Sequence, residues 1–293
     1  LELDGWYTNN VTNMAYMFMG CNSLIDVNMD DCDMCSVTDM MCMFKGCSNL
    51  SDINMSSCKM GNVIRTTQMF DGCSSLQNVD IRGSDMSSVT QMNYMFCNCS
   101  SLTNIDFVGS WDIGGVTSAN TAGMFDNCIG IISINLSEWN MNSVTSMEGM
   151  FRNCTNLKSV DMSSWNMSGA ASMNGMFEGC ENLASVNMRE AKLENVVSIN
   201  WMFRSCSNLK NVNMSGIDLG SASSANELFA RCSNLEDIDM SGADFGSLTY
   251  GLWFTDCCNL INVNMNGVNL KSLTSAWAMF ENCKNLVCVD MGD

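Results

Sequence analysis

Apolar side chains recur along this chain with a period of 26 residues. In each period a Phe, preceded in most units by Met, is followed three residues later by a Cys. The Phe positions are Phe18, Phe44, Phe70, Phe96, Phe125, Phe151, Phe177, Phe203, Phe229, Phe254 and Phe280. The spacing departs from 26 twice, to 29 residues after Phe96 and to 25 residues after Phe229. A fixed period of this length predicts a solenoid, in which each unit buries its apolar face against its neighbours.

The first half of each unit has the apolar spacing of an amphipathic helix. In the first full unit the apolar residues are Val11, Met14, Met17, Phe18, Cys21 and Leu24, which step by three residues or by one. Ser or Asn precedes the Val in most units, and both are common N-cap residues. Two residues after the Phe stands Gly or Asn in most units, as Gly20 does here, and both accept the left-handed backbone that ends a helix. The spacing therefore predicts a helix of about two turns in each unit.

The second half of each unit alternates between apolar and polar residues. Val27 and Met29 fall on one side, and Asp26 and Asn28 fall on the other. Alternation with a period of two predicts a strand, and one strand per unit in the same sense predicts a parallel sheet. We therefore expect an α/β solenoid, with one parallel sheet of about 12 short strands and short helices on the opposite side.

The repeat runs through the whole chain, so we expect residues 1–293 to form a single solenoid of about 11 repeats. Neither end carries a polar capping unit, although solenoids need one. The sequence therefore predicts a column that is uncapped at both ends and belongs to a longer chain. Head-to-tail stacking of such columns into a filament is the alternative.

Composition excludes several function classes. The chain has no His, which is the commonest general acid–base and the commonest metal ligand, so we expect no enzymatic activity, cofactor or metal site. The 31 acidic and 13 basic residues give a net charge of −18, which disfavours nucleic acid as a partner. No apolar run is long enough to insert into a membrane.

Eleven of the 18 Cys residues share one repeat position, beginning with Cys21 and Cys47. We interpret this ladder as small buried apolar residues. Neighbouring rungs would lie about 5 Å apart, so distance alone leaves disulfides open as an alternative.

The consensus V-T-x-M-x-x-M-F-x-G/N-C-x-x-L-x-x-V-N/D-M resembles the BspA-like leucine-rich-repeat surface proteins, over the full chain. The chain departs from that family in using Met where the family prefers Leu. The resemblance implies a non-enzymatic, surface-exposed or secreted module that binds proteins or glycans, as adhesins do. A self-associating filament or particle shell is the alternative.

Two surfaces are candidates for binding. Outward strand positions form a stripe of carboxylates and amides, for which a plain solvated face is the alternative and Ca²⁺ assistance is a weaker one. The stripe residues that we select are Asp26, Asn28, Asp52, Asn54, Asp80, Asp106, Asp161, Asp237 and Asp239. Trp111, Trp139 and Trp165 share another repeat position, where they would hold a sugar ring or anchor a protein partner. Packing at a corner of the coil is the alternative for these Trp residues.

Overall fold

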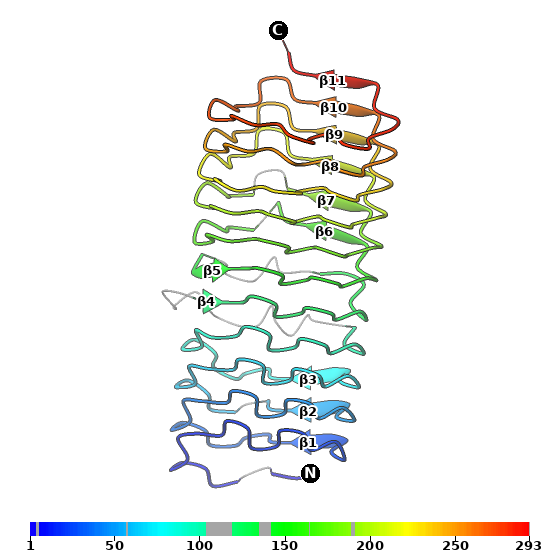
Figure 1. The fold of residues 1–293 in the computed structure, drawn as a ribbon. Helices are drawn as coiled ribbons and strands as arrows, with labels where there is room; N and C mark the ends of the chain where they lie inside the picture. Colours follow the sequence, from blue (N-terminus) through cyan, green and yellow to red (C-terminus); the bar gives the residue numbers. More distant parts are fainter. Residues whose placement is uncertain are drawn as a thin grey trace.

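The chain winds into coils that stack in one column, with the two termini at opposite ends (Figure 1). This is a computed structural model, and it describes residues 1–3, 6–56, 58–103, 119–134, 142–163, 165–188 and 191–292. Coils on either side of residues 104–118 are hydrogen-bonded to each other, since the Phe96 amide donates to the Met124 carbonyl at 2.9 Å.

The predicted parallel sheet is confirmed. Nine of the eleven strands that the structure describes occupy the predicted repeat position and lie along one side of the column (Figure 1). They pair in parallel with equivalent residues in register, as Val186 does with Val212. These strands are β1 (Asp26–Asn28), β2 (Asp52–Asn54), β3 (Asn78–Asp80), β6 (Ser159–Asp161), β7 (Ser185–Asn187), β8 (Asn211–Asn213), β9 (Asp237–Asp239), β10 (Asn262–Asn264) and β11 (Cys288–Asp290).

Two further strands lie where helices were expected. These are β4 (Ala119–Asn120) and β5 (Val144–Ser146), which pair in parallel in the Val-Thr part of their units. Single β-bridges join Ser146, Ser172, Ser198 and Ser224 in the same part of the following units. We call this row of pairings, which begins with β4 and β5, the second ladder. A third ladder joins Asp218, Asp244 and Asn269. The expectation of about 12 strands in one sheet therefore gives way, within the described chain, to three sets of parallel pairing around each coil.

The prediction of short helices is wrong, because the described residues contain none. In every unit except that of Phe254, two positions adopt left-handed backbone, one two residues before the Phe and one two residues after it. The Phe254 unit has only the second, at Asp256. Gly149 (φ 57°) and Asn153 (φ 57°) are the pair around Phe151. A left-handed residue in mid-segment prevents a right-handed helix from continuing. The chain therefore makes successive tight turns, and each returns the side chains to the interior after about three residues.

Hydrogen bonds between coils replace the bonds of a helix. The amides of Met147, Gly149 and Phe151 donate to carbonyls of the next coil at 2.8–2.9 Å. The intervening amides of Met150 and Arg152 instead donate to carbonyls three residues back in the same coil. The apolar spacing is thus the same as a helix would show, although the backbone is not helical.

The predicted N-caps have a different role. Asn62 and Asn195 donate through their side-chain amides to the backbone carbonyls of Cys35 and Ser168 in the preceding coil, at 2.6 and 2.8 Å. Ser and Asn before the Val therefore tie coils together, because no helix start exists there to be capped.

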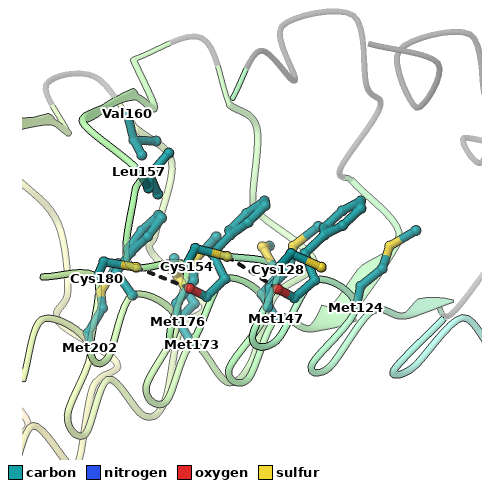
Figure 2. Packing of buried hydrophobic residues seen from close by; sticks show 14 of the residues in the cluster. Met124, Cys128, Met147, Cys154, Leu157, Val160, Met173, Met176, Cys180 and Met202 are labelled. Carbon is teal, nitrogen blue, oxygen red and sulfur yellow. Dashed lines mark hydrogen bonds between the residues drawn. The ribbon is translucent and has the colours of Figure 1, made fainter. Parts of the chain in front are cut away.

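The interior is a set of stacked columns of identical side chains. Rings of successive Phe residues stack from Phe18 to Phe280, with centroids 5.3–5.8 Å apart and planes within 13°. Cys128, Cys154 and Cys180 form a parallel row beside buried Met side chains (Figure 2). All eleven ladder Cys residues are free thiols, and most are buried.

Each ladder thiol from Cys47 onward has a specific partner. Its Sγ donates to the backbone carbonyl of the Phe that stands one coil earlier, as Cys154 does to Phe125 at 3.2 Å and Cys180 to Phe151 at 3.1 Å (Figure 2). The prediction of small buried residues is confirmed, and this hydrogen bond explains why the position holds Cys.

Candidate binding groove on the strand face

The strands β1–β3 and β6–β11 expose two parallel rows of side chains. Their central Val or Ile residues point inward and are buried from β1 to β10, as Val212 and Ile238 are. The first and third residues of each strand point outward, and we call these the leading row and the trailing row. In an extended strand the two rows lie about 7 Å apart, and successive coils repeat them every ~4.8 Å. Together the rows define the strand face.

Hydrogen bonds along the strand face pair an amide in one coil with a carboxylate in the coil before. Asn187 donates to Oδ1 of Asp161 at 3.0 Å, and Asn78 donates likewise to Asp52. In β10, Asn262 donates to Asp237 at 2.8 Å and Asn264 donates to Asp239 at 3.1 Å. The expectation that alternating Asn and Asp offsets repulsion between stacked carboxylates fits these contacts.

Several carboxylates of the strand face are held in their ionised form. The pKa of Asp161 is lowered by hydrogen bonds from the side chain and backbone of Ser163 and from Asn187. The pKa of Asp52 is lowered first by the Ser51 hydroxyl and then by the Asn78 amide. Arg82 forks onto Asp80 at 3.0 and 2.6 Å and lowers its pKa. Asp52, Asp80 and Asp161 therefore stay ionised well below neutral pH.

Two stretches of the strand face are hollowed into grooves. The larger groove holds about 470 Å³ and runs across β7 to β10. Its polar lining consists of Asn187, Asn211, Asn213, Asp237, Asp239, Asn262 and Asn264. The smaller groove holds about 310 Å³ over β1 to β3. Its polar lining consists of Glu2, Asp26, Asn28, Asp52, Asn54, Asn78 and Asp80.

The structure brings most of the predicted stripe residues together in these grooves. Asp26, Asn28, Asp52, Asn54 and Asp80 line the smaller groove, and Asp237 and Asp239 line the larger one. Asp161 lies on the same face in β6, outside both linings. Asp106 falls outside the described residues.

The predicted Trp surface is not supported where it is described. Trp165 is 3% exposed and packs in the core, so it offers no ring to a ligand. Equivalent side chains such as Cys58 and Ala243 are also buried. Corner packing, the alternative considered for this position, therefore describes Trp165. Trp111 and Trp139 lie outside the described residues.

Sequence reasoning missed a row of ion pairs near the Phe ladder. Lys45 lies 2.9 Å from Asp71, and Arg152 pairs with the largely buried Asp126. Arg204 is shared between Glu178 at 3.5 Å and Glu227 at 3.1 Å. Opposite charges at one repeat position, the residue after each Phe, would have revealed most of this row. We interpret it as a device that holds neighbouring coils in register.

Neither a metal site nor a membrane span is found in the part of the chain that the structure describes. No three His, Cys, Asp or Glu residues there are placed to hold a metal ion. No described segment is a helix of the length and apolar character that crossing a bilayer needs.

Two family models match the chain. The family described as "Mycoplasma protein of unknown function, DUF285" matches residues 1–111 and again 100–209. The "BspA type Leucine rich repeat region (6 copies)" matches residues 173–287. The chain belongs to the BspA-like leucine-rich-repeat family. The resemblance in the repeat consensus is thereby confirmed, and neither description names a catalytic activity.

Solved structures that are similar to this BspA-like chain include two bacterial leucine-rich-repeat proteins, both at low identity. A leucine-rich cell surface protein from Faecalibacterium prausnitzii is 18% identical over 96% of this chain and 83% of its own, with a TM-score of 0.45. A leucine-rich repeat protein from Eubacterium ventriosum is 12% identical over 91% of this chain and 72% of its own, with a TM-score of 0.39. No curated protein matches this BspA-like chain in sequence.

Proposed function

We propose that this BspA-like chain is a non-enzymatic interaction module that binds a protein or glycan ligand along its strand face. One observation carries the proposal: two grooves on the same face are lined by outward amides and carboxylates in register over successive coils. A regular array of this kind recognises a ligand through many weak polar contacts along a rigid surface.

The same proposal places the module at a cell surface or in the secreted medium, where adhesin-like binding would operate. Membership of the BspA-like family supports this location. Head-to-tail assembly into a filament stays a prediction from the sequence.

A binding array tests the proposal directly. Purified protein would be applied to printed glycans and matrix proteins, alongside an Asn213→Arg/Asn262→Arg variant whose long side chains fill the larger groove. Both substituted side chains point away from the core, so the fold is expected to tolerate them. The matched control is Ser223→Arg/Thr249→Arg, which adds the same charge at two exposed residues outside the strand face.

We expect the groove variant to lose the ligands that the wild-type protein and the control both retain. If every ligand binds the groove variant as strongly as the wild type, the strand face is not the binding surface and the proposal is overturned.

A further inference from the structure

Resting on the proposed function, we propose that the larger groove takes an extended basic segment of a partner protein. A Lys or Arg side chain of that segment would lie on the paired carboxylates of Asp237 and Asp239. The occupant is inferred from charge complementarity and from the kinds of side chain that line this unpartnered sheet face.

Strand β9 concentrates negative charge in the middle of the groove. Asp237 and Asp239 both point outward from β9, while the flanking strands β8 and β10 carry Asn at all four corresponding positions. Each carboxylate accepts an Asn amide through Oδ1, which leaves both Oδ2 atoms without a partner in the described chain. No described Lys or Arg forms an ion pair with either one.

A single cationic side chain fits between these two acids. Residues two apart in a strand are separated by about 7 Å, so an ammonium or guanidinium group midway can contact both carboxylates. The net charge of −18 adds a long-range attraction for a basic partner.

The Asn side chains favour a peptide over other ligands of the same charge. Amide groups both donate and accept hydrogen bonds, as the backbone of an extended peptide requires. The groove has no aromatic lining on which a sugar ring would stack. The described acids also form no cluster that would hold a bare metal ion.

The length of the groove matches a short peptide segment. Four strands, β7 to β10, span about 14 Å at ~4.8 Å per coil, which an extended segment of about four residues covers. A long Lys or Arg stem can adjust to the difference between the peptide repeat and the coil repeat.

Fluorescence anisotropy with labelled ten-residue peptides tests this inference. The probes are alternating Lys-Ser, Gln-Ser and Glu-Ser sequences, each titrated with the full chain at low and at physiological salt. The variant Asp237→Asn/Asp239→Asn gives β9 the Asn-x-Asn pattern that β8 and β10 already carry, so its fold is expected to be retained. The matched control is Asp218→Asn/Asp244→Asn, which removes the same charge from the third ladder.

We expect the Lys-Ser peptide to bind the wild type more tightly than the other two peptides. Asp237→Asn/Asp239→Asn should weaken that binding about tenfold, and the control Asp218→Asn/Asp244→Asn should leave it within about twofold. Equal weakening by both variants would mean general attraction to net charge and would overturn the inference, as would no binding of the Lys-Ser peptide.

The array separates this inference from the function on which it rests. Asn213→Arg/Asn262→Arg could lose binding of neutral glycans or proteins while Asp237→Asn/Asp239→Asn binds the Lys-Ser peptide as tightly as the wild type does. That result would mean that the strand face binds ligands but not basic segments. If neither Asn213→Arg/Asn262→Arg nor Asp237→Asn/Asp239→Asn changes the binding of any ligand, both proposals fail.

Discussion

At the residue scale, the role of a side chain depends on what stands one coil away. Asp161 faces Asn187 across the ladder and accepts its amide. Asp26, by contrast, faces Asp52 in register, and the Ser51 hydroxyl lies 3.2 Å from Asp26 and 2.5 Å from Asp52. The same residue type therefore faces an amide donor in one coil and a second carboxylate in another, where a Ser hydroxyl contacts both acids.

Replacing Asp161 by Asn should change how stability depends on pH. The folded pKa of Asp161 is lowered, so its ionised form stabilises the fold above the unfolded pKa of about 4, and that contribution is lost as pH falls through the folded value. We expect the stability of the wild type relative to Asp161→Asn to be constant near neutral pH and to fall as the pH drops below about 4. Urea unfolding at several pH values measures the difference.

Asp218→Asn is the control for that series, since it removes one exposed charge from another ladder. A difference between wild type and Asp161→Asn that stays constant down to pH 2 would contradict the assignment of hydrogen-bonded, ionised Asp161.

At the scale of the element, one apolar pattern proved compatible with two backbone conformations. Met147, Met150, Phe151 and Cys154 are fully buried, as the predicted helix would also have required. The choice between turns and helix is made by the left-handed residues and by the carbonyls that the next coil supplies. Tyr94, Trp201 and Glu227 adopt the same left-handed backbone as Gly149, so the stack imposes this conformation on side chains that do not favour it.

Replacing Gly149 by Ala distinguishes turns from helices by the sign of its effect. In a helix the substitution would stabilise by about 1 kcal/mol. Gly149 instead has φ 57°, where a Cβ is unfavourable, and its nearest neighbours at 3.6 Å leave room for a methyl group. We therefore expect Gly149→Ala to lower the free energy of unfolding by about 1 kcal/mol, measured by urea unfolding followed by circular dichroism.

The reverse change at the equivalent position provides a check. Ala278 has φ 54°, so Ala278→Gly should cost nothing or stabilise slightly, whereas in a helix it would cost about 1 kcal/mol. Stabilisation by Gly149→Ala together with destabilisation by Ala278→Gly would restore the helical interpretation.

At the scale of the whole molecule, the column is held by ladders that run from coil to coil. The Phe stack, the thiol bonds to Phe carbonyls and a row of Asn side chains all repeat along its axis. In that Asn row, Asn208 donates to Asn182 at 3.0 Å and Asn234 donates to Asn208 at 3.1 Å. Stability in such a stack comes mainly from contacts between neighbouring units.

Alkylation of the thiols should report the integrity of the column. Exposed Cys21, Cys35 and Cys288 are expected to react within minutes in native conditions. Burial raises the pKa of Cys58 to about 12, which keeps its thiol protonated and unreactive. Interior ladder thiols such as Cys154 should react only as coils open, so their labelling should follow added urea. Mass spectrometry of peptides reads each site, and rapid native labelling of Cys154 would contradict the buried ladder.

Several features of the fold could be predicted because they depend on periodicity alone. The Phe and Cys positions, the inward Val of each strand and the parallel register follow from a repeat that returns the same side chain to the same place. Asp237 and Asp239 were placed outward for the same reason. Trp165 was misjudged as a binding residue, since a variable side-chain size at one repeat position suits both a surface and a roomy corner of the core.

The sequence by itself determined the period, the identity of the stacked side chains and the polarity of the strand face, because each depends only on the order of residues within one unit. The tertiary structure decided the backbone conformation of the first half of each repeat, which begins with the Val-Thr pair. It also decided the second and third ladders of parallel pairing and the position of the grooves. The physical reason is that the hydrogen-bond partners of these segments lie about one repeat away, as the Ser172 carbonyl does for the Met147 amide. A local pattern cannot distinguish an amide that bonds within its own turn from one that bonds to the next coil.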